Sequence, residues 1–123
     1  MIKARKDKER RSHPRLENNI PIKISQENGD IVTETGNISR SGIYCRVERQ
    51  VEPMTKFKVQ LLLPIKKGGK DTSKKISCEG IVVRVEPVNN GQYNIAIFFS
   101  DITQRDAETI ADYVANYLEE ARN

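Results

Sequence analysis

Residues 76–99 read ISCEGIVVRVEPVNNGQYNIAIFF, and this stretch decides the fold. Apolar and β-branched residues fill both of its halves. Ile76 to Glu86 and Tyr93 to Phe99 are therefore each predicted to form a β-strand. Between them, Asn89-Asn90-Gly91 has the residue types of a tight turn. The stretch predicts two long strands joined directly to each other.

Upstream of this pair, four shorter segments are also predicted to be strands. They are Ile20–Ile24, Ile31–Glu34, Ile43–Val47 and Phe57–Leu63. Asn28-Gly29 favours a hairpin turn between the first two, and Pro64 is expected to end the fourth. Residues 36–42 are predicted to form a polar turn, and residues 66–75 a mobile, solvated hairpin connection. Six strands with no helix between them predict an all-β fold, a six-stranded antiparallel barrel without free strand edges.

One helix is expected after the last strand. Thr103 precedes Asp106 by three residues, which approximates a capping box. Five apolar residues then recur at helical spacing and form one stripe: Ala107, Ile110, Ala111, Val114 and Leu118. We expect this stripe to pack on the barrel, and a partner-binding helix is the alternative. The sequence thus predicts a single domain with an N-terminal arm (1–15), a barrel (16–101) and a C-terminal helix (102–123).

The positive charge of the chain is concentrated in the arm. The whole chain of 123 residues has a net charge of +4, whereas residues 1–15 hold seven basic and two acidic residues, a net +5. The arm has little apolar character and is expected to be flexible. It also contains no aromatic residue, although aromatic residues usually accompany the basic surface of a nucleic-acid binder.

Several functional classes are excluded by residue content. No apolar run reaches the roughly 20 residues of a membrane span, and the charged N-terminus does not resemble a secretory signal, so we expect a cytoplasmic protein, complete from its initiating Met. Cys45 and Cys78 are expected to be reduced and buried. His13 is the only histidine, so no metal site and no cofactor are expected. No nucleophile with a neighbouring base and no phosphate-binding glycine loop is present, so no catalytic residue and no enzyme activity are predicted.

Two motifs indicate a site for an anionic ligand that contains guanine. Arg11-Ser-His-Pro-Arg15 places two guanidinium groups around a proline that prevents a regular helix. Arginine binds phosphate and also the O6/N7 edge of guanine. Asn37-Ile-Ser39-Arg-Ser-Gly42 supplies small polar side chains and backbone N–H groups that can approach an anion.

The order and spacing of these motifs, together with the predicted strands, resemble the PilZ domain, the bacterial receptor module for cyclic di-GMP. The resemblance runs from about Arg10 to Leu118. It implies that Arg11 and Arg15 contact guanine edges and phosphate oxygens, and that Asn37, Ser39 and Gly42 line the pocket. It also suggests that Arg10, preceding the first motif arginine, favours a stacked pair of ligand molecules over a single one.

Two positions depart from the most common family pattern. Asn37 stands where many members have Asp. The amide keeps an acceptor and loses a charge that would repel phosphate, so we expect it to be tolerated. Ala96 stands where many members have Gly, three residues before Phe99. Its methyl group either fits the barrel interior, which we favour, or crowds the ligand.

The resemblance implies a regulatory binding module. Cyclic di-GMP would order the arm against the barrel and alter contact with an unidentified protein partner, with no nucleic-acid polymer and no membrane span involved. Two alternatives stay open. One is a PilZ-type adaptor that acts without ligand, although all five motif residues are present. The other is a small β-barrel that binds nucleic acid through the arm and residues 66–75.

Overall fold

The computed structural model describes residues 15–16, 19–26 and 29–122, with side chains described for 19–26 and 29–117. Arg10, Arg11 and the remainder of the arm before Arg15 lie outside this part of the chain. The elements are β1 (Arg15–Leu16), β2 (Pro21–Gln26), β3 (Gly29–Ser39), β4 (Gly42–Val47), β5 (Lys56–Lys67), β6 (Lys70–Pro87), the short 3-10 turn η1 (Asn89–Gly91), β7 (Tyr93–Asp101) and α2 (Gln104–Arg122).

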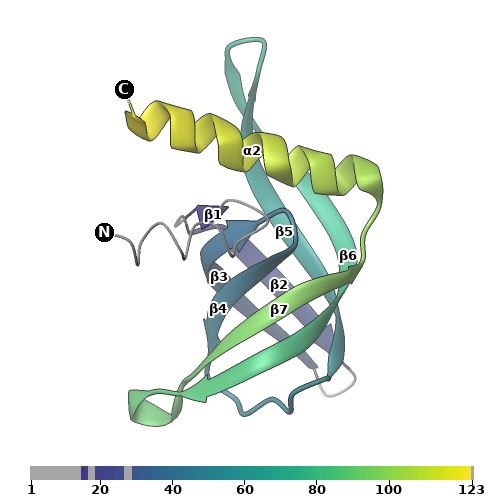
Figure 1. Ribbon diagram of the computed structural model, residues 1–123, viewed down its shortest axis with the longest axis vertical. Coiled ribbons are helices and arrows are strands. Elements are labelled where there is room, and N and C mark those ends of the chain that lie inside the picture. The colour runs from purple at the N-terminus through teal and green to yellow at the C-terminus, as the bar shows by residue number, and fades with distance from the viewer. Residues whose placement is uncertain (1–14, 17–18, 27–28, 123) are drawn as a thin grey trace, which may run out of the picture.

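Six of the strands form a closed antiparallel ring in the order β3-β2-β5-β6-β7-β4, which β3 closes by pairing with β4. This confirms the predicted barrel-like fold with one C-terminal helix. The two-residue strand β1 was not predicted. It pairs with the end of β3, where Arg15 lies opposite Ser39 and Leu16 opposite Ile38. Figure 1 shows the strands wrapped around a common interior.

The core fills the inside of the ring with β-branched and leucine side chains that alternate along each strand with outward-facing residues. On β7, for example, Ile95, Ile97 and Phe99 are buried, whereas Phe98 is half exposed. Fully buried residues come from every strand of the ring and include Ile22, Ile38, Leu61, Ile76 and Ile97. Buried and outward-facing residues therefore alternate with a period of two along each strand, which gives the sheet a buried inner face and an exposed outer face.

Helix α2 lies across one end of the ring (Figure 1), where it contacts β1, β3 and β5. Its N-terminus is capped by Thr103, whose Oγ1 accepts a hydrogen bond from the Asp106 N–H at 3.1 Å. Ile110 and Val114, two residues of the predicted apolar stripe, are buried in the core. The buried Tyr113 joins them and was not predicted.

Two predicted boundaries were wrong. Pro64 does not end its strand, because β5 continues to Lys67 with Pro64 opposite Ser73. Pairing of β5 with β2 stops at Leu61. Pro64 therefore lies where this edge of β5 has no partner strand, and the N–H that it lacks costs no ladder hydrogen bond there. Residues 66–75 are therefore a regular β-hairpin with the turn Gly68-Gly69, in which both residues have the positive φ angles of a tight turn (60° and 79°).

The second wrong boundary concerns residues 36–42, which are not one polar turn. β3 extends to Ser39 and β4 begins at Gly42, so only Arg40 and Ser41 form the turn. The strand continues because Asn37 and Ser39 both have partners across the β3–β4 ladder. Two motif side chains thereby stand on a strand rather than in a loop.

The Cys45 thiol lies in the core, and both cysteines are free. Burial raises the pKa of Cys45 from 9.0 to about 12. Between these values the unfolded thiol loses its proton and the folded thiol keeps it, so stability falls as pH rises above 9. We expect the free energy of unfolding by urea to decline by up to about 1.4 kcal/mol per pH unit from this thiol. The Cys45→Ala variant should show a flatter decline, and identical slopes would contradict the assignment.

Candidate functional site

The turn between β3 and β4 is held together by Ser39. Its side chain is only 6% exposed, and its Oγ accepts a hydrogen bond from the Ser41 N–H at 3.3 Å. The same oxygen lies 3.2 Å from Ser41 Oγ and 3.5 Å from the Gly42 carbonyl oxygen. The hydroxyl therefore bonds within the turn, and Ser39 fixes its shape.

Gly42 brings this turn directly against β7. A Cβ atom at position 42 would lie 2.3 Å from the Ile97 carbonyl oxygen, closer than real Cβ contacts come. The Phe99 N–H also donates to the Ser41 carbonyl oxygen at 2.9 Å. The glycine is thus required for close approach of two strands, rather than for a left-handed backbone conformation.

Asn37 reaches the same surface through a β-bulge. Thr35 lies opposite Cys45, but Asn37 lies opposite Tyr44, so Gly36 is the extra residue on β3. Asn37 is half-buried and stands beside the outward-facing Tyr44. The bulge thus places the amide next to the outer face of β4.

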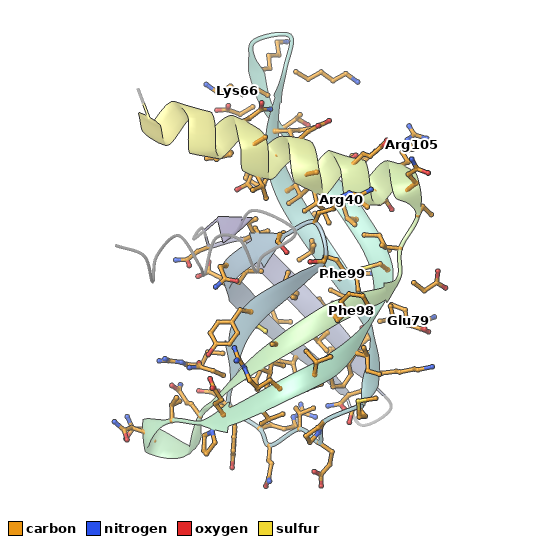
Figure 2. The ribbon with its side chains drawn as sticks, viewed as in Figure 1. Arg40, Lys66, Glu79, Phe98, Phe99 and Arg105 are labelled. Atoms are coloured by element: carbon orange, nitrogen blue, oxygen red, sulfur yellow. The ribbon has the colours of Figure 1, made fainter. Side chains whose placement is uncertain are left out.

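These residues border a shallow hollow of about 140 Å³ on the outside of β4, β6 and β7. Its lining includes the motif residues Asn37, Ser39 and Gly42 and the further side chains Tyr44, Arg84 and Phe98. Phe98 is 50% exposed, and Val83, which also lines the hollow, is 53% exposed, so the two form a small apolar patch there. Figure 2 labels Phe98 beside Phe99, which points into the core.

Tyr44 and Arg84 form the polar side of the hollow. The Arg84 guanidinium carbon lies 5.8 Å from the Tyr44 ring centroid, within the range of a cation–π contact. The Tyr44 hydroxyl donates to Glu86 Oε1 at 2.8 Å. Burial, and then this bond to Glu86, raise the pKa of Tyr44 above 10.0, so the phenol stays neutral. Arg84 Nε lies 3.9 Å from Glu86, an exposed and weak pair that leaves the guanidinium open to an anion.

Tyr44, Arg84 and Phe98 were not predicted to be site residues, because their spacing in the sequence matches no motif. Tyr44 and Phe98 were assigned only to strands, and Arg84 to the long strand before the turn. The sequence did contain a signal for Phe98, namely the alternation of inward-facing and outward-facing residues along its strand. The buried Ile97 and Phe99 place Phe98 outside the ring, where a large apolar side chain suggests a contact surface.

Ala96 also lies outside the ring. It is opposite Tyr44 on β4 and Arg84 on β6, and it borders the hollow. The favoured interpretation that its methyl group fills the barrel interior was therefore wrong. The interior positions on either side belong to Ile95 and Ile97. Its methyl group faces the same space as the motif residues.

The backbone register joins the two motifs. Arg15, the last residue of the Arg-x-x-x-Arg motif, lies directly opposite Ser39 in the β1–β3 pair. Residues 24 positions apart in the chain thereby meet at one turn. Arg10 and Arg11 precede the described residues, so the structure does not place them.

Other site types find no support in the described part of the chain. It contains no group of three or more His, Cys, Asp or Glu side chains arranged to hold a metal ion. Among the described residues, no helix is long and apolar enough to cross a membrane.

Comparison with known proteins places this architecture. Several solved structures share the fold. The inhibitor of motility MotI/DgrA of Bacillus subtilis has 20% identity and a TM-score of 0.81, over 93% of this chain and 54% of that one. The chain therefore spans about half the length of that protein. The PilZ domain of YcgR from Escherichia coli, solved with c-di-GMP, has 11% identity and a TM-score of 0.65, over 92% and 95%.

No curated protein sequence matches the chain. The family model of the PilZ domain, by contrast, matches residues 9–116, which include both motifs and every strand of the ring. The chain belongs to the PilZ domain family.

Proposed function

We propose that this protein is a cyclic di-GMP-binding regulatory module of the cytoplasm, and not an enzyme. The observation that carries the proposal is the register of β1, which sets Arg15 opposite Ser39 at the turn beside the hollow. Family membership supports the ligand, since the YcgR domain of the same family is solved with c-di-GMP.

The proposed roles follow from the chemistry of each residue. Arg11 and Arg15 contact guanine edges and phosphate oxygens. Asn37 offers an amide and Gly42 an open backbone at the edge of the hollow. Ser39, whose hydroxyl is bonded within the turn, contributes by fixing the backbone against which the ligand lies.

The small volume of the hollow explains why the arm would be needed to enclose the ligand. Its volume of about 140 Å³ is well below the roughly 300–1,000 Å³ of pockets that enclose a small ligand. Part of the ligand would rest on the surface beside Phe98, and the arm would cover the rest. We expect saturating cyclic di-GMP to increase amide-exchange protection in residues 8–16. Unchanged protection there would exclude closure of the arm.

Arg10 is proposed to determine how many ligand molecules each chain binds. A further guanidinium can stack on a purine and offset the charge of a second ligand molecule. Two ligand molecules for each chain are therefore proposed. A calorimetric stoichiometry of one would remove this role from Arg10 and leave the receptor function intact.

The regulatory output is proposed to pass to a protein partner, whose contact with the domain changes when the ligand binds. Ligand and arm together would form a new surface that the partner meets. A ligand-independent adaptor and a nucleic-acid binder are the alternatives that the experiment must separate.

Calorimetric titration of the purified chain separates them. We expect saturable binding of cyclic di-GMP and at least tenfold weaker binding of cyclic di-AMP, whose adenine keeps N7 but presents an N6 amino donor in place of the guanine O6 acceptor. A 20-base-pair duplex should lose affinity steeply between 50 and 200 mM salt if it binds at all. No heat with either dinucleotide, from a chain shown to be folded, would favour the adaptor. Tighter binding of the duplex would favour the nucleic-acid binder.

A further inference from the structure

Tyr44, Arg84 and Glu86 form a small network on the outer face of the sheet, outside both motifs. Ala96 of β7 lies opposite Tyr44 of β4 on one side and opposite Arg84 of β6 on the other. The backbones of β4 and β6 are therefore two strand spacings apart, about 9.5 Å. The Arg84 guanidinium carbon nevertheless lies 5.8 Å from the centroid of the Tyr44 aromatic ring. The two side chains thus lean toward each other above the small side chain of Ala96.

Glu86 contacts both members of this pair. Its Oε1 accepts a hydrogen bond of 2.8 Å from the Tyr44 hydroxyl, and its Oε2 lies 3.9 Å from Arg84 Nε. Arg84 forms no hydrogen bond with another described residue, and its side chain is 59% exposed. The aromatic ring of Tyr44 therefore lies on one side of the guanidinium, and the other side is open to solvent.

A bulge on β6 places apolar surface beside this guanidinium. Pairing of β6 with β7 shifts between Val82 and Arg84, so Val83 is the extra residue. Val82 is buried, whereas Val83 and Arg84 both line the hollow. Phe98 of β7 lines it as well. The open side of the guanidinium therefore adjoins exposed apolar side chains.

This combination suits a purine base better than a phosphate. A phosphate beside Val83 and Phe98 would exchange water for apolar groups that cannot donate hydrogen bonds to it. A base has a flat face that can cover both side chains and can also stack on a guanidinium plane. The β3–β4 turn, where Arg15 lies opposite Ser39, remains for the phosphates.

We propose that one guanine of cyclic di-GMP stacks on the open side of the Arg84 guanidinium, which makes Arg84 a ligand-binding residue outside both motifs. The layers are then the Tyr44 ring, the guanidinium and the base, so the cation has an aromatic partner on each side. This role rests on the proposed function, since the base belongs to the ligand proposed for the same site.

Calorimetric titration of the full chain with cyclic di-GMP, at about 150 mM salt, tests this role. Arg84→Ala and Arg84→Lys should each bind at least fivefold more weakly than wild type, because lysine keeps the charge but has no planar face on which a base stacks. Arg46→Ala is the matched control and should stay within twofold. It removes the same charge from the next outward position of β4, where Arg46 Nε donates to Asn94 Oδ1 at 3.0 Å and does not border the hollow.

Binding of Arg84→Lys within twofold of wild type would overturn stacking, because charge alone would then explain the Arg84→Ala result. Stacking tolerates every base, so Arg84→Ala should weaken cyclic di-AMP by the same factor as cyclic di-GMP. A loss confined to cyclic di-GMP would mean that Arg84 reads the guanine edge, and would also overturn stacking. If wild type binds cyclic di-GMP and the Arg84 variants match it, this role alone fails. If wild type binds no dinucleotide, the proposed function fails and this role fails with it.

Discussion

Replacement of Gly42 by alanine is expected to lower the free energy of unfolding by about 1–3 kcal/mol. The added Cβ atom would lie 2.3 Å from the Ile97 carbonyl oxygen and 3.3 Å from Phe98 Cα. Both are backbone atoms, so relief requires β4 to move away from β7 and not a change of rotamer. Urea unfolding of wild type and variant, followed by circular dichroism, measures the difference.

Gly36→Ala is the matched control, because Gly36 lies on the neighbouring strand and also has no positive φ. A Cβ atom there would lie 3.4 Å from the Tyr44 carbonyl oxygen, an ordinary contact. We expect a change of less than about 1 kcal/mol in either direction. Equal losses in both variants would show that close approach at Gly42 is not the reason for its glycine.

The double variant Arg11→Ala/Arg15→Ala is expected to show the largest loss of cyclic di-GMP affinity. Removal of one charge-assisted contact costs about 1.5–3 kcal/mol, roughly a ten- to hundredfold change in Kd. Each single variant should fall in this range, and the double variant should fall beyond it. Calorimetry at moderate salt measures all three against wild type.

Arg5→Ala is the control for the arginine variants, because it removes the same side chain from the same arm outside the motif. It should change Kd less than threefold, as expected for a distant charge screened by salt. A loss as large as that of Arg15→Ala would mean that the arm attracts the ligand only through its net charge. The motif would then have no specific role.

Much of the fold could be predicted because the strands are amphipathic with a period of two. The helix was predicted from its cap at Thr103 and its apolar stripe. Contacts that depend on distant residues were not predictable. β1 exists only because Arg15 and Leu16 meet the end of β3. Pro64 stays within a strand only because β2 has ended before it.

The candidate site was predictable as a pair of motifs, but not as a surface. Spacing marked Asn37, Ser39 and Gly42, and the structure brings all three to one hollow. The spacing did not show that the Ser39 hydroxyl forms its hydrogen bonds within its own turn. Nor did the spacing show that Phe98 and Arg84, which lie 40 or more residues after the motif, complete the lining of the hollow. Those positions follow from the ladder that joins β4, β7 and β6.

The most direct test of the site is a titration of the ¹⁵N-labelled chain with cyclic di-GMP, followed by amide chemical shifts. The site described here predicts large, saturable shifts for Asn37, Gly42 and Phe98, with little change at Asn90 in the turn between β6 and β7. Shifts confined to other surfaces, or no shifts at millimolar ligand from a folded chain, would contradict a cyclic di-GMP site at the β3–β4 turn.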